Sequence, residues 1–331
     1  MTASLSVIIP TYNRGLLLGG AIRSALAQMG PGDELIVVDD GSTDDTRAVV
    51  DSFGDRVTYV CGQHRGAGPA RNLGIAHAHG DLVAFLDSDD EWLPGTLAGR
   101  RAFMEARPDV LFSFTDFRVV KANRTVEEHY LRHWEHDPRS FREMFGAPSR
   151  VAGCDADAYV GDLYRWQLTG LYILTDTLMV RREAAGDALR YGEVREFYED
   201  LHCFIRLSSR GKAAYIDMES TQQTEFATNR LTGLSPMIRL RCQIEVLEST
   251  YGGDAEFLAR HGDLYRQTMA EKRLKLLKAR ILTEDFSAAR ETLEKLPAAP
   301  LSIRLLLRSP DMCCRALVRL YQHARALVPR S

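Results

Sequence analysis

Residues 34–44 read Glu-Leu-Ile-Val-Val-Asp-Asp-Gly-Ser-Thr-Asp, an apolar run that ends in two aspartates and a turn. A short, continuously apolar run is typical of a strand buried on both faces of a sheet. Similar runs recur through the first half of the chain, separated by stretches with helical spacing. This alternation predicts an α/β fold with a Rossmann-like, mostly parallel sheet flanked by helices. The expected strands are 5–9, 34–38, 57–61 and 82–86, and the expected helices are 16–28, 46–53 and 69–79.

The second half of the chain changes character twice. Residues 121–168 are rich in charged, aromatic and histidine side chains and have poor periodicity, so we expect an excursion with short helices there. Beyond about residue 234 the pattern is helical. The sequence therefore predicts an α/β domain over 1–233 and an α-helical C-terminal extension over 234–331. Further strands are expected at 111–114, 172–180 and 213–216, and further helices at 199–207, 237–251, 256–282, 286–296 and 310–327.

Composition narrows the partners and the compartment. The formal net charge of −3 gives no global field that attracts nucleic acid, so no nucleic-acid partner is expected. The six cysteines form no C-x-x-C pair, and their scatter fits a reducing compartment. The N-terminus lacks the basic start of a signal peptide, and no apolar stretch is long enough to span a bilayer. We expect a cytoplasmic protein that can still contact a membrane surface.

Carboxylates gather where the predicted strands end. Asp39-Asp40 follows one strand, Asp87-Ser-Asp-Asp90 follows another, and Thr115-Asp116 ends a third. In open parallel α/β sheets, ligands bind beyond the carboxyl ends of the strands. The sequence therefore predicts an acidic ligand site at this edge of the sheet.

Four blocks of the chain resemble the signature blocks of family 2 glycosyltransferases. They are Val7-Ile-Ile-Pro-Thr-Tyr-Asn-Arg14, Val37-Val-Asp-Asp-Gly-Ser-Thr-Asp44, Ala70-Arg-Asn-Leu-Gly74 and Phe85-Leu-Asp-Ser-Asp-Asp90, in the family's order and spacing. Together they are highly specific, and the resemblance covers roughly the first 220 residues, the size of one large domain. It implies that residues 1–233 form a GT-A catalytic domain that binds a nucleotide-sugar. It also implies a hexosyltransferase that transfers the sugar to a hydroxyl with inversion and usually needs a divalent cation.

The predicted metal site follows from the donor's charge. A nucleotide-sugar carries a diphosphate with about two negative charges, which carboxylates repel unless a cation bridges them. By the resemblance, Asp89 ligates Mg²⁺ or Mn²⁺, Asp87 contacts the metal or the ribose, and Ser88 belongs to the nucleotide-sugar site. The cation would neutralise charge on the leaving diphosphate. The alternative is a polar turn that caps a helix before Trp92.

The resemblance also assigns the nucleotide contacts. Asp40 would accept the imide N–H of uracil or thymine, which cytosine does not offer at the same place. Tyr12 can stack on the base, and Asp39 is expected to hold the loop or the ribose. For Arg71 two interpretations stay open, contact with the nucleotide and an ion pair with Asp87. The remaining nucleotide-sugar candidates are Pro10, Thr11 and Arg14.

The segment Phe197-Tyr-Glu-Asp-Leu-His-Cys-Phe-Ile-Arg206 looks like the family's Glu-Asp block at the start of a helix. The resemblance assigns Asp200 as the catalytic base and Glu199 as its supporting neighbour. Transfer needs one base close to the acceptor hydroxyl. The alternative is that both acids favour the helix dipole from its first turn. The loop over 222–230 departs from the family because it lacks a histidine, and Arg230 is the candidate substitute.

Three other functions share some of these sequence features. The main alternative is a catalytically inactive nucleotide-sugar or glycan-binding module on the same fold, against which Asp89 and Asp200 argue. A nucleotidyltransferase would usually carry a glycine-rich, lysine-containing phosphate loop near the N-terminus, and the sequence has none. The stretch Gly66-Ala-Gly-Pro-Ala-Arg71 resembles a dinucleotide fingerprint only superficially, because its third glycine is missing.

The acceptor is expected to be a glycan or a lipid-linked acceptor in polysaccharide or glycoconjugate biosynthesis, and the 121–168 excursion is expected to face it. Residues 300–331 carry six arginines and one aspartate, a net charge of +5, so the remainder carries −8. A basic amphipathic helix over 310–327 can contact the inner face of a membrane peripherally. The alternative is a helix packed on the catalytic domain. Its apolar face comprises Cys313, Leu317, Leu320, Tyr321, Ala324, Leu327 and Val328, with Arg315, Arg319 and Arg325 off it.

Overall fold

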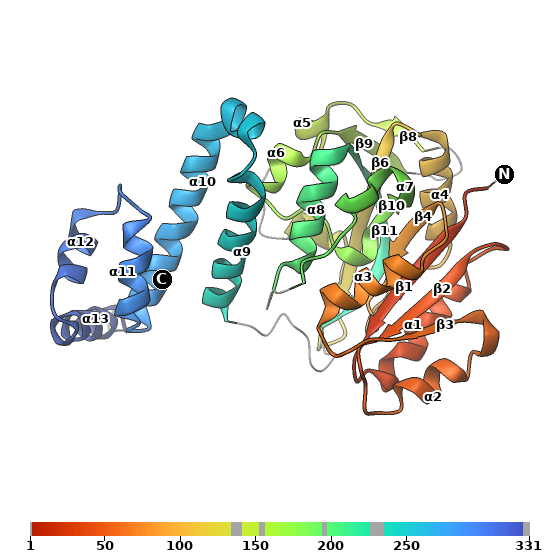
Figure 1. Cartoon of the computed structure of the whole chain (residues 1–331), viewed down its shortest axis with the longest axis horizontal. Helices are drawn as coiled ribbons and strands as arrows, with labels where there is room; N and C mark the ends of the chain where they lie inside the picture. Colours follow the sequence, from red (N-terminus) through yellow and green to blue (C-terminus); the bar gives the residue numbers. More distant parts are fainter. Residues whose placement is uncertain (1, 134–140, 152–155, 194–196, 226–234, 327–331) are drawn as a thin grey trace. The chain divides into compact units, whose positions relative to one another are not determined.

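The computed structural model describes residues 2–133, 141–151, 156–193, 197–225 and 235–326. The chain divides into two compact units, Met1–Arg230 and Leu231–Ser331. In Figure 1 the first unit runs from red to green and the second from cyan to blue. No helix in the described ranges combines the length and the apolar character that crossing a membrane would require.

The first unit is built on one mixed sheet whose N-terminal half is parallel. Strand β1 (Leu5–Thr11) pairs with β2 (Glu34–Asp39) on one side and with β4 (Leu82–Phe85) on the other, and β3 (Thr58–Cys61) extends β2. All four predicted strands are confirmed to within two residues. Because these strands are parallel, their carboxyl ends share one edge of the sheet, where the acidic loops begin.

The other half of the sheet is mixed. Strand β10 (Met179–Arg181) runs antiparallel between β4 and β6 (Val110–Val120), and β11 (Lys212–Thr224) runs parallel to β6. Strand β9 (Asp157–Gly161) pairs with β11. Short strands complete the sheet: β5 (Glu91–Trp92) beside β11, β7 (Val126–Glu127) beside β6, and β8 (Ser149–Arg150) beside β9.

Two predicted strands have different bounds in the structure. The strand expected at 172–180 is confined to Met179–Arg181, and a 3₁₀ turn, η3 (Thr175–Thr177), precedes it. Strand β6 does not end at Asp116 but continues through Val120. Asp116 is fully buried within it and accepts hydrogen bonds from Leu131 N–H and Tyr215 O–H, so it does not belong to the acidic edge.

Helices cover both faces of the sheet (Figure 1). On one face α1 (Gly15–Leu26) and α4 (Thr96–Ala106) pack against alternate residues of β1, such as Val7. On the other face α3 (Ala67–His77) and α8 (Glu199–Arg210) pack over Ile8 and its neighbours. The two faces alternate because successive strand side chains point to opposite sides. Helix α4 was not predicted; the other helix of this half is α2 (Thr46–Asp51).

The excursion between β6 and β10 contains short helices, as predicted, together with the unpredicted strands β7, β8 and β9. Tyr172, which follows it, is fully buried in the core. The short elements are η2 (Tyr130–His133), α5 (Phe141–Phe145) and α6 (Tyr164–Gln167), and η1 (Gly54–Arg56), α7 (Arg182–Ala185) and η4 (Gly186–Ala188) lie elsewhere in the unit.

The second unit is helical, as predicted. Side-chain caps start three of its helices: Ser235 accepts Ile238 N–H, and Asp254 and Asp285 cap the next two in the same way. The unpredicted helix is α12, which follows Pro300. The helices are α9 (Pro236–Tyr251), α10 (Ala255–Leu282), α11 (Phe286–Glu294), α12 (Leu301–Arg308) and α13 (Asp311–Ala326).

Candidate active site

The loops after β1 and β2 are tied together by side chains. Asn13 adopts a left-handed backbone conformation (φ 51°), which asparagine tolerates better than most residues. Its N–H donates to Ser42 Oγ and its Oδ1 accepts Thr43 N–H, both at 2.8 Å. Asp39 accepts Ser42 N–H and the Tyr59 hydroxyl, also at 2.8 Å. Asp39 therefore holds the loop, one of its two predicted roles.

Asp40 lies against the loop that leads into α3. It is buried, and its carboxylate accepts Arg65 N–H at 3.0 Å and Gly66 N–H at 2.6 Å. The half-exposed Tyr12 ring stacks on His64 with a centroid distance of 4.2 Å. The predicted base-binding pair thus shares one loop, and His64 is a neighbour that the sequence did not reveal.

The glycines of the false dinucleotide fingerprint have structural roles. Gly66 starts α3 with φ 98°, a conformation that side chains rarely adopt. A Cβ on Gly68 would lie 2.1 Å from Gly192 O and close to Glu199. These glycines therefore let α3 begin and approach the segment that leads into α8.

The predicted metal loop follows β4 at the acidic edge. Asp89 is paired with Arg14, whose Nη1 lies 2.5 Å from Asp89 Oδ2. Asp87 Oδ1 accepts a hydrogen bond from Arg71 Nη2 at 2.7 Å. Asp90, which was not predicted as a site residue, is buried and accepts Gln223 Nε2 at 3.1 Å. Each acid of the loop therefore has a cationic or polar partner.

A further carboxyl group, that of Asp176 in η3, lies beneath this loop. It is fully buried, and its Oδ1 accepts Asp87 N–H at 2.6 Å. Carboxylate oxygens of Asp87, Asp90 and Asp176 lie within 4.8 Å of one another. Burial, reinforced by the charges of Asp87 and Asp90, raises the pKa of Asp176 well above its usual value.

The backbone around Asp176 is fixed as well. Its carbonyl oxygen accepts the Trp92 indole N–H at 3.0 Å and the Thr221 hydroxyl at 3.2 Å. The buried Arg100 donates to the neighbouring Thr177 carbonyl at 2.7 Å. Asp176 is therefore held from β5, β11 and α4 while it holds the start of the metal loop.

Arg71 joins this loop to the predicted base. Its Nη1 donates to Glu199 at 3.0 Å, across 128 positions of sequence, while its Nη2 bonds to Asp87. The guanidinium also lies 5.1 Å from the centre of the Tyr191 ring. Although burial opposes the charged form, Asp87 and Glu199 raise the pKa of Arg71 well above its usual value. Of the two interpretations, the structure contains the ion pair with Asp87.

Asn72 secures the same junction. Its Nδ2 donates to Tyr191 O at 3.0 Å and its Oδ1 accepts Tyr191 N–H at 2.8 Å. These bonds fix the segment before α8 against α3. Arg71 and Asn72 therefore join α3 to α8 and to the segment before it.

Asp200 lies in the first turn of α8. Tyr198, just before the helix, has a left-handed backbone (φ 65°), an uncommon conformation for a bulky side chain. Burial and the charge of Glu199 raise the pKa of Asp200 to about 7, while Arg71 opposes the shift. A carboxylate that titrates near neutral pH suits a general base.

Some of the predicted residues are thus brought together around Arg71, which bonds to Asp87 and Glu199, and the charges of all three act on Asp200. Asp89 pairs with Arg14 instead. Pro10, Thr11 and Ser88 are buried. Arg230 lies outside the described residues.

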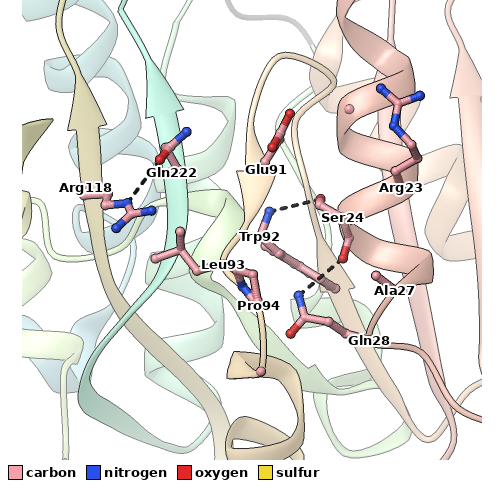
Figure 2. A pocket seen from close by; sticks show the side chains of 12 residues that line it. Arg23, Ser24, Ala27, Gln28, Glu91, Trp92, Leu93, Pro94, Arg118 and Gln222 are labelled. Atoms are coloured by element: carbon pink, nitrogen blue, oxygen red, sulfur yellow. Dashed lines mark hydrogen bonds between the residues drawn. The ribbon is translucent and has the colours of Figure 1, made fainter. Parts of the chain in front are cut away.

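A pocket of about 420 Å³ opens between α1, residues 91–95 and the strands β6 and β11 (Figure 2). Figure 2 shows Arg23, Glu91, Arg118 and Gln222 around it, with Arg118 hydrogen-bonded to Gln222. None of the predicted donor, metal or base residues lines this pocket.

The structure resembles solved glycosyltransferases. TarS of S. aureus, crystallised with UDP-GlcNAc, matches with a TM-score of 0.58 and 21% identity over 97% of this chain and 92% of that one. The mannosyltransferase PcManGT of Pyrobaculum calidifontis, in complex with GDP-Man and Mn²⁺, matches with a TM-score of 0.54 and 19% identity over 97% and 84%. At these identities the matches establish the fold, which is GT-A.

Sequence comparisons also find glycosyltransferases. TuaG of Bacillus subtilis, a glycosyltransferase whose name places it provisionally in teichuronic acid biosynthesis, is 28% identical over 69% of this chain and 81% of its own length. WfgD of Escherichia coli, a UDP-Glc:α-D-GlcNAc-diphosphoundecaprenol β-1,3-glucosyltransferase, is 34% identical over 37% of this chain, which spans about half (49%) of its length. Residues 6–159, a little under half of the chain, match the family described as glycosyl transferase family 2, and the chain has the GT-A fold.

Proposed function

We propose that this chain is an inverting, metal-dependent glycosyltransferase that moves a sugar from a nucleoside diphosphate donor to a hydroxyl group of a glycan or lipid-linked acceptor. The observation that carries the proposal is Arg71, which bonds to both Asp87 and Glu199. Arg71 thereby bridges Asp87, on the proposed donor side, and α8, which carries the proposed base Asp200. The two relatives and the two structural neighbours are glycosyltransferases by name or by fold, which supports the same conclusion.

In this proposal Asp200 accepts the proton of the acceptor hydroxyl. The freed oxygen forms a bond to the anomeric carbon while the bond from that carbon to the diphosphate oxygen breaks on the opposite side. Glu199 supports the base by raising its pKa, and Arg71 holds Glu199 in place. Water-poor surroundings strengthen each of these charge interactions.

Asp87 and Asp89 are proposed to hold Mg²⁺ or Mn²⁺, because hard cations prefer carboxylate oxygens. Asp89 pairs with the Arg14 guanidinium, so this carboxylate already has a cationic partner in the structure. Asp176 is fully buried and Asp90 is buried, whereas Asp87 and Asp89 are partly exposed, so the latter two are the acids of this loop that solvent reaches. When bound, the cation would neutralise charge on the departing diphosphate.

The function is tested with a panel of nucleotide-sugars and Mn²⁺. A donor at a hundredfold excess over its dissociation constant should stabilise the protein by about 2.7 kcal/mol. Turnover of that donor with an acceptor should then release the nucleoside diphosphate and give a product of inverted anomeric configuration. Donor binding with neither transfer nor hydrolysis would instead identify an inactive binding module.

Asp176 gives a prediction about metal affinity. Asp176→Ala removes the acceptor of Asp87 N–H and should weaken Mn²⁺ binding by about 10- to 100-fold, the usual cost of losing a group that orients a ligand. Asp176→Asn keeps an acceptor oxygen and should recover most of the affinity. Calorimetric titration of Mn²⁺ into each variant measures this. Wild-type affinity in Asp176→Ala would remove Asp176 from the site.

Donor base preference gives a second prediction. Asp40 is proposed to accept the imide N–H of uracil or thymine, so UDP or TDP should bind more tightly than GDP. The fold itself does not decide, because one neighbour was crystallised with UDP-GlcNAc and the other with GDP-Man.

The test compares nucleotide binding by wild type and Asp40→Asn. Asparagine offers one acceptor oxygen where Arg65 N–H and Gly66 N–H both require one, so the loop should loosen. We expect UDP affinity to fall by about tenfold, the value of one to two kcal/mol for a lost buried hydrogen bond. Tighter calorimetric binding of GDP than of UDP and TDP would refute the assignment.

The acceptor is proposed to be presented at the cytoplasmic surface of a membrane, as a lipid-linked glycan. WfgD acts on an undecaprenol-linked sugar by name, which supports this choice. Peripheral contact through the C-terminal helix belongs to the same proposal.

A further inference from the structure

The C-terminal helices leave apolar side chains exposed in one short stretch. Nine large apolar side chains are exposed in the described part of the chain, and five of them lie between residues 301 and 320. They come from α12 and α13, which are neighbours in the second unit (Figure 1). Clustered exposure of this kind marks an interaction surface, whereas scattered exposed leucines need no explanation. The five are Leu301 (70% exposed), Leu305 (55%), Met312 (79%), Leu317 (53%) and Leu320 (71%).

The packing of α13 within the second unit uses only one of its apolar faces. The helix packs on the other helices of its unit through Cys314 and Val318, which are buried. The apolar face predicted from the sequence is a different one, and its described members Cys313, Leu317 and Leu320 are exposed. Packing within the second unit therefore does not account for this face.

Helix α12 repeats the arrangement. Leu307 is buried in the core of the unit, whereas Leu301 and Leu305, four positions apart, are exposed on one face of the helix. Arg304 and Arg308 each follow one of these leucines by three positions, so each lies one turn away on the same side. Leucines and arginines thus alternate along the surface of α12.

We propose that this leucine–arginine surface, formed by the five exposed apolar residues with Arg304, Arg308, Arg315 and Arg319, docks on an anionic lipid bilayer. Its leucines would enter the boundary between headgroups and acyl chains, and its arginines would stay among the headgroups. The inference deepens the proposed function, because it rests on a lipid-linked acceptor and says which surface would bring the enzyme to it.

Charge selects the bilayer over a second copy of the chain. Residues 300–331 carry +5, and a twofold dimer through this surface would oppose two such charges. The remainder of the chain carries −8, so an anionic membrane attracts this end and repels the rest. Arg315 and Arg319 already share Glu284, which leaves an excess of positive charge on the surface.

The experiment is sedimentation of the full chain with vesicles. Wild type should bind vesicles of phosphatidylcholine with phosphatidylglycerol and should bind pure phosphatidylcholine weakly. Replacing Leu301, Leu305, Leu317 and Leu320 by glutamine should weaken binding by more than about tenfold. Arg304→Gln with Arg308→Gln should lower the preference for anionic vesicles and the sensitivity to salt. Leu16→Gln, a fully exposed leucine of the first unit, is the matched control.

Thermal unfolding and donor binding of each variant separate docking from folding and from the proposed activity, because exposed leucines contribute little to either. The proposal is overturned if wild type stays in the supernatant with anionic vesicles, or if the leucine variant binds them as wild type does. A leucine-dependent dimer in analytical ultracentrifugation without vesicle binding would overturn it in favour of a second copy.

Discussion

Replacing Asp200 by asparagine should lower sugar transfer by roughly two to four orders of magnitude, the usual contribution of a positioned acid–base group. Asparagine keeps the size of the side chain and its hydrogen-bonding reach but cannot take a proton. Donor affinity should barely change, because the proposed base faces the acceptor. The measurement is paired, turnover and donor dissociation constant for the same variant. More than about a tenth of wild-type turnover would show that the base is another residue.

Stability provides an independent readout of the same variant. The pKa of Asp200 is raised to about 7 in the folded chain from an ordinary value of 3.8, so the folded state binds the proton more tightly. The charged side chain therefore costs stability, and this cost is absent below pH 4 and grows as the pH rises toward 7. Asp200→Asn should be at least as stable as wild type above pH 7. A helix-dipole role predicts the opposite, a loss of up to about 1 kcal/mol.

The pH profile follows from the same groups. Asp200 must be deprotonated to act, so kcat/KM should rise with pH through about 7. Glu199 and Asp87 raise this pKa, and Arg71 lowers it. Glu199→Gln should therefore move the rising limb to lower pH. Two neutral groups face Asp200 as well, the Tyr191 hydroxyl and the Cys203 thiol, and burial keeps both protonated at these pH values.

Chelation should abolish transfer, and Mn²⁺ or Mg²⁺ should restore it. Asp89→Asn should weaken metal-dependent donor binding and lower turnover by at least about a hundredfold, since a cation supplies several kcal/mol to a developing diphosphate charge. This pattern differs from that of Asp200→Asn, which spares donor binding. Calorimetry of donor with and without Mn²⁺, beside turnover, separates the two.

Two variants control this experiment. Arg14→Gln frees Asp89 from its ion pair, so this variant should still bind Mn²⁺ when the titration contains no donor. Asp51→Asn removes an exposed acid whose surface pair with Arg47 contributes little, so it should behave as wild type. Full turnover in chelator, together with an active Asp89→Ala, would remove the metal from the mechanism.

The sequence predicted the parallel half of the sheet because each strand there is buried on both faces and reads as a continuous apolar run. It missed Asp176 because that residue sits in what read as the middle of a strand. Asp176 reaches the acidic loop because β10 runs antiparallel to β4, so the start of β10 lies beside the end of β4. No local pattern encodes that pairing. A carboxylate just before a short apolar run is the one available signal.

Ambiguities in the sequence were of a different kind. Arg71 had two interpretations, and the structure contains its ion pair with Asp87. Its second bond, to Glu199, was not predicted, because it depends on the approach of α3 to α8 that Gly68 permits. The sequence of α13 did not show which apolar residues are buried, because two faces of that helix carry apolar residues. Helix α12 escaped prediction because its eight residues lie between Pro300 and Pro310, too few for a clear period.

Because one guanidinium serves both Asp87 and Glu199, the donor side and the acceptor side of the site are thermodynamically linked. The charge of Asp87 helps to raise the pKa of Asp200, so neutralising that charge lowers it again. With the proposed cation at Asp87, the site would therefore hold more of the proposed base, Asp200, in the form that can take a proton, and by reciprocity a deprotonated Asp200 would strengthen cation binding. Under the proposed roles, donor loading and the readiness of the base would each favour the other.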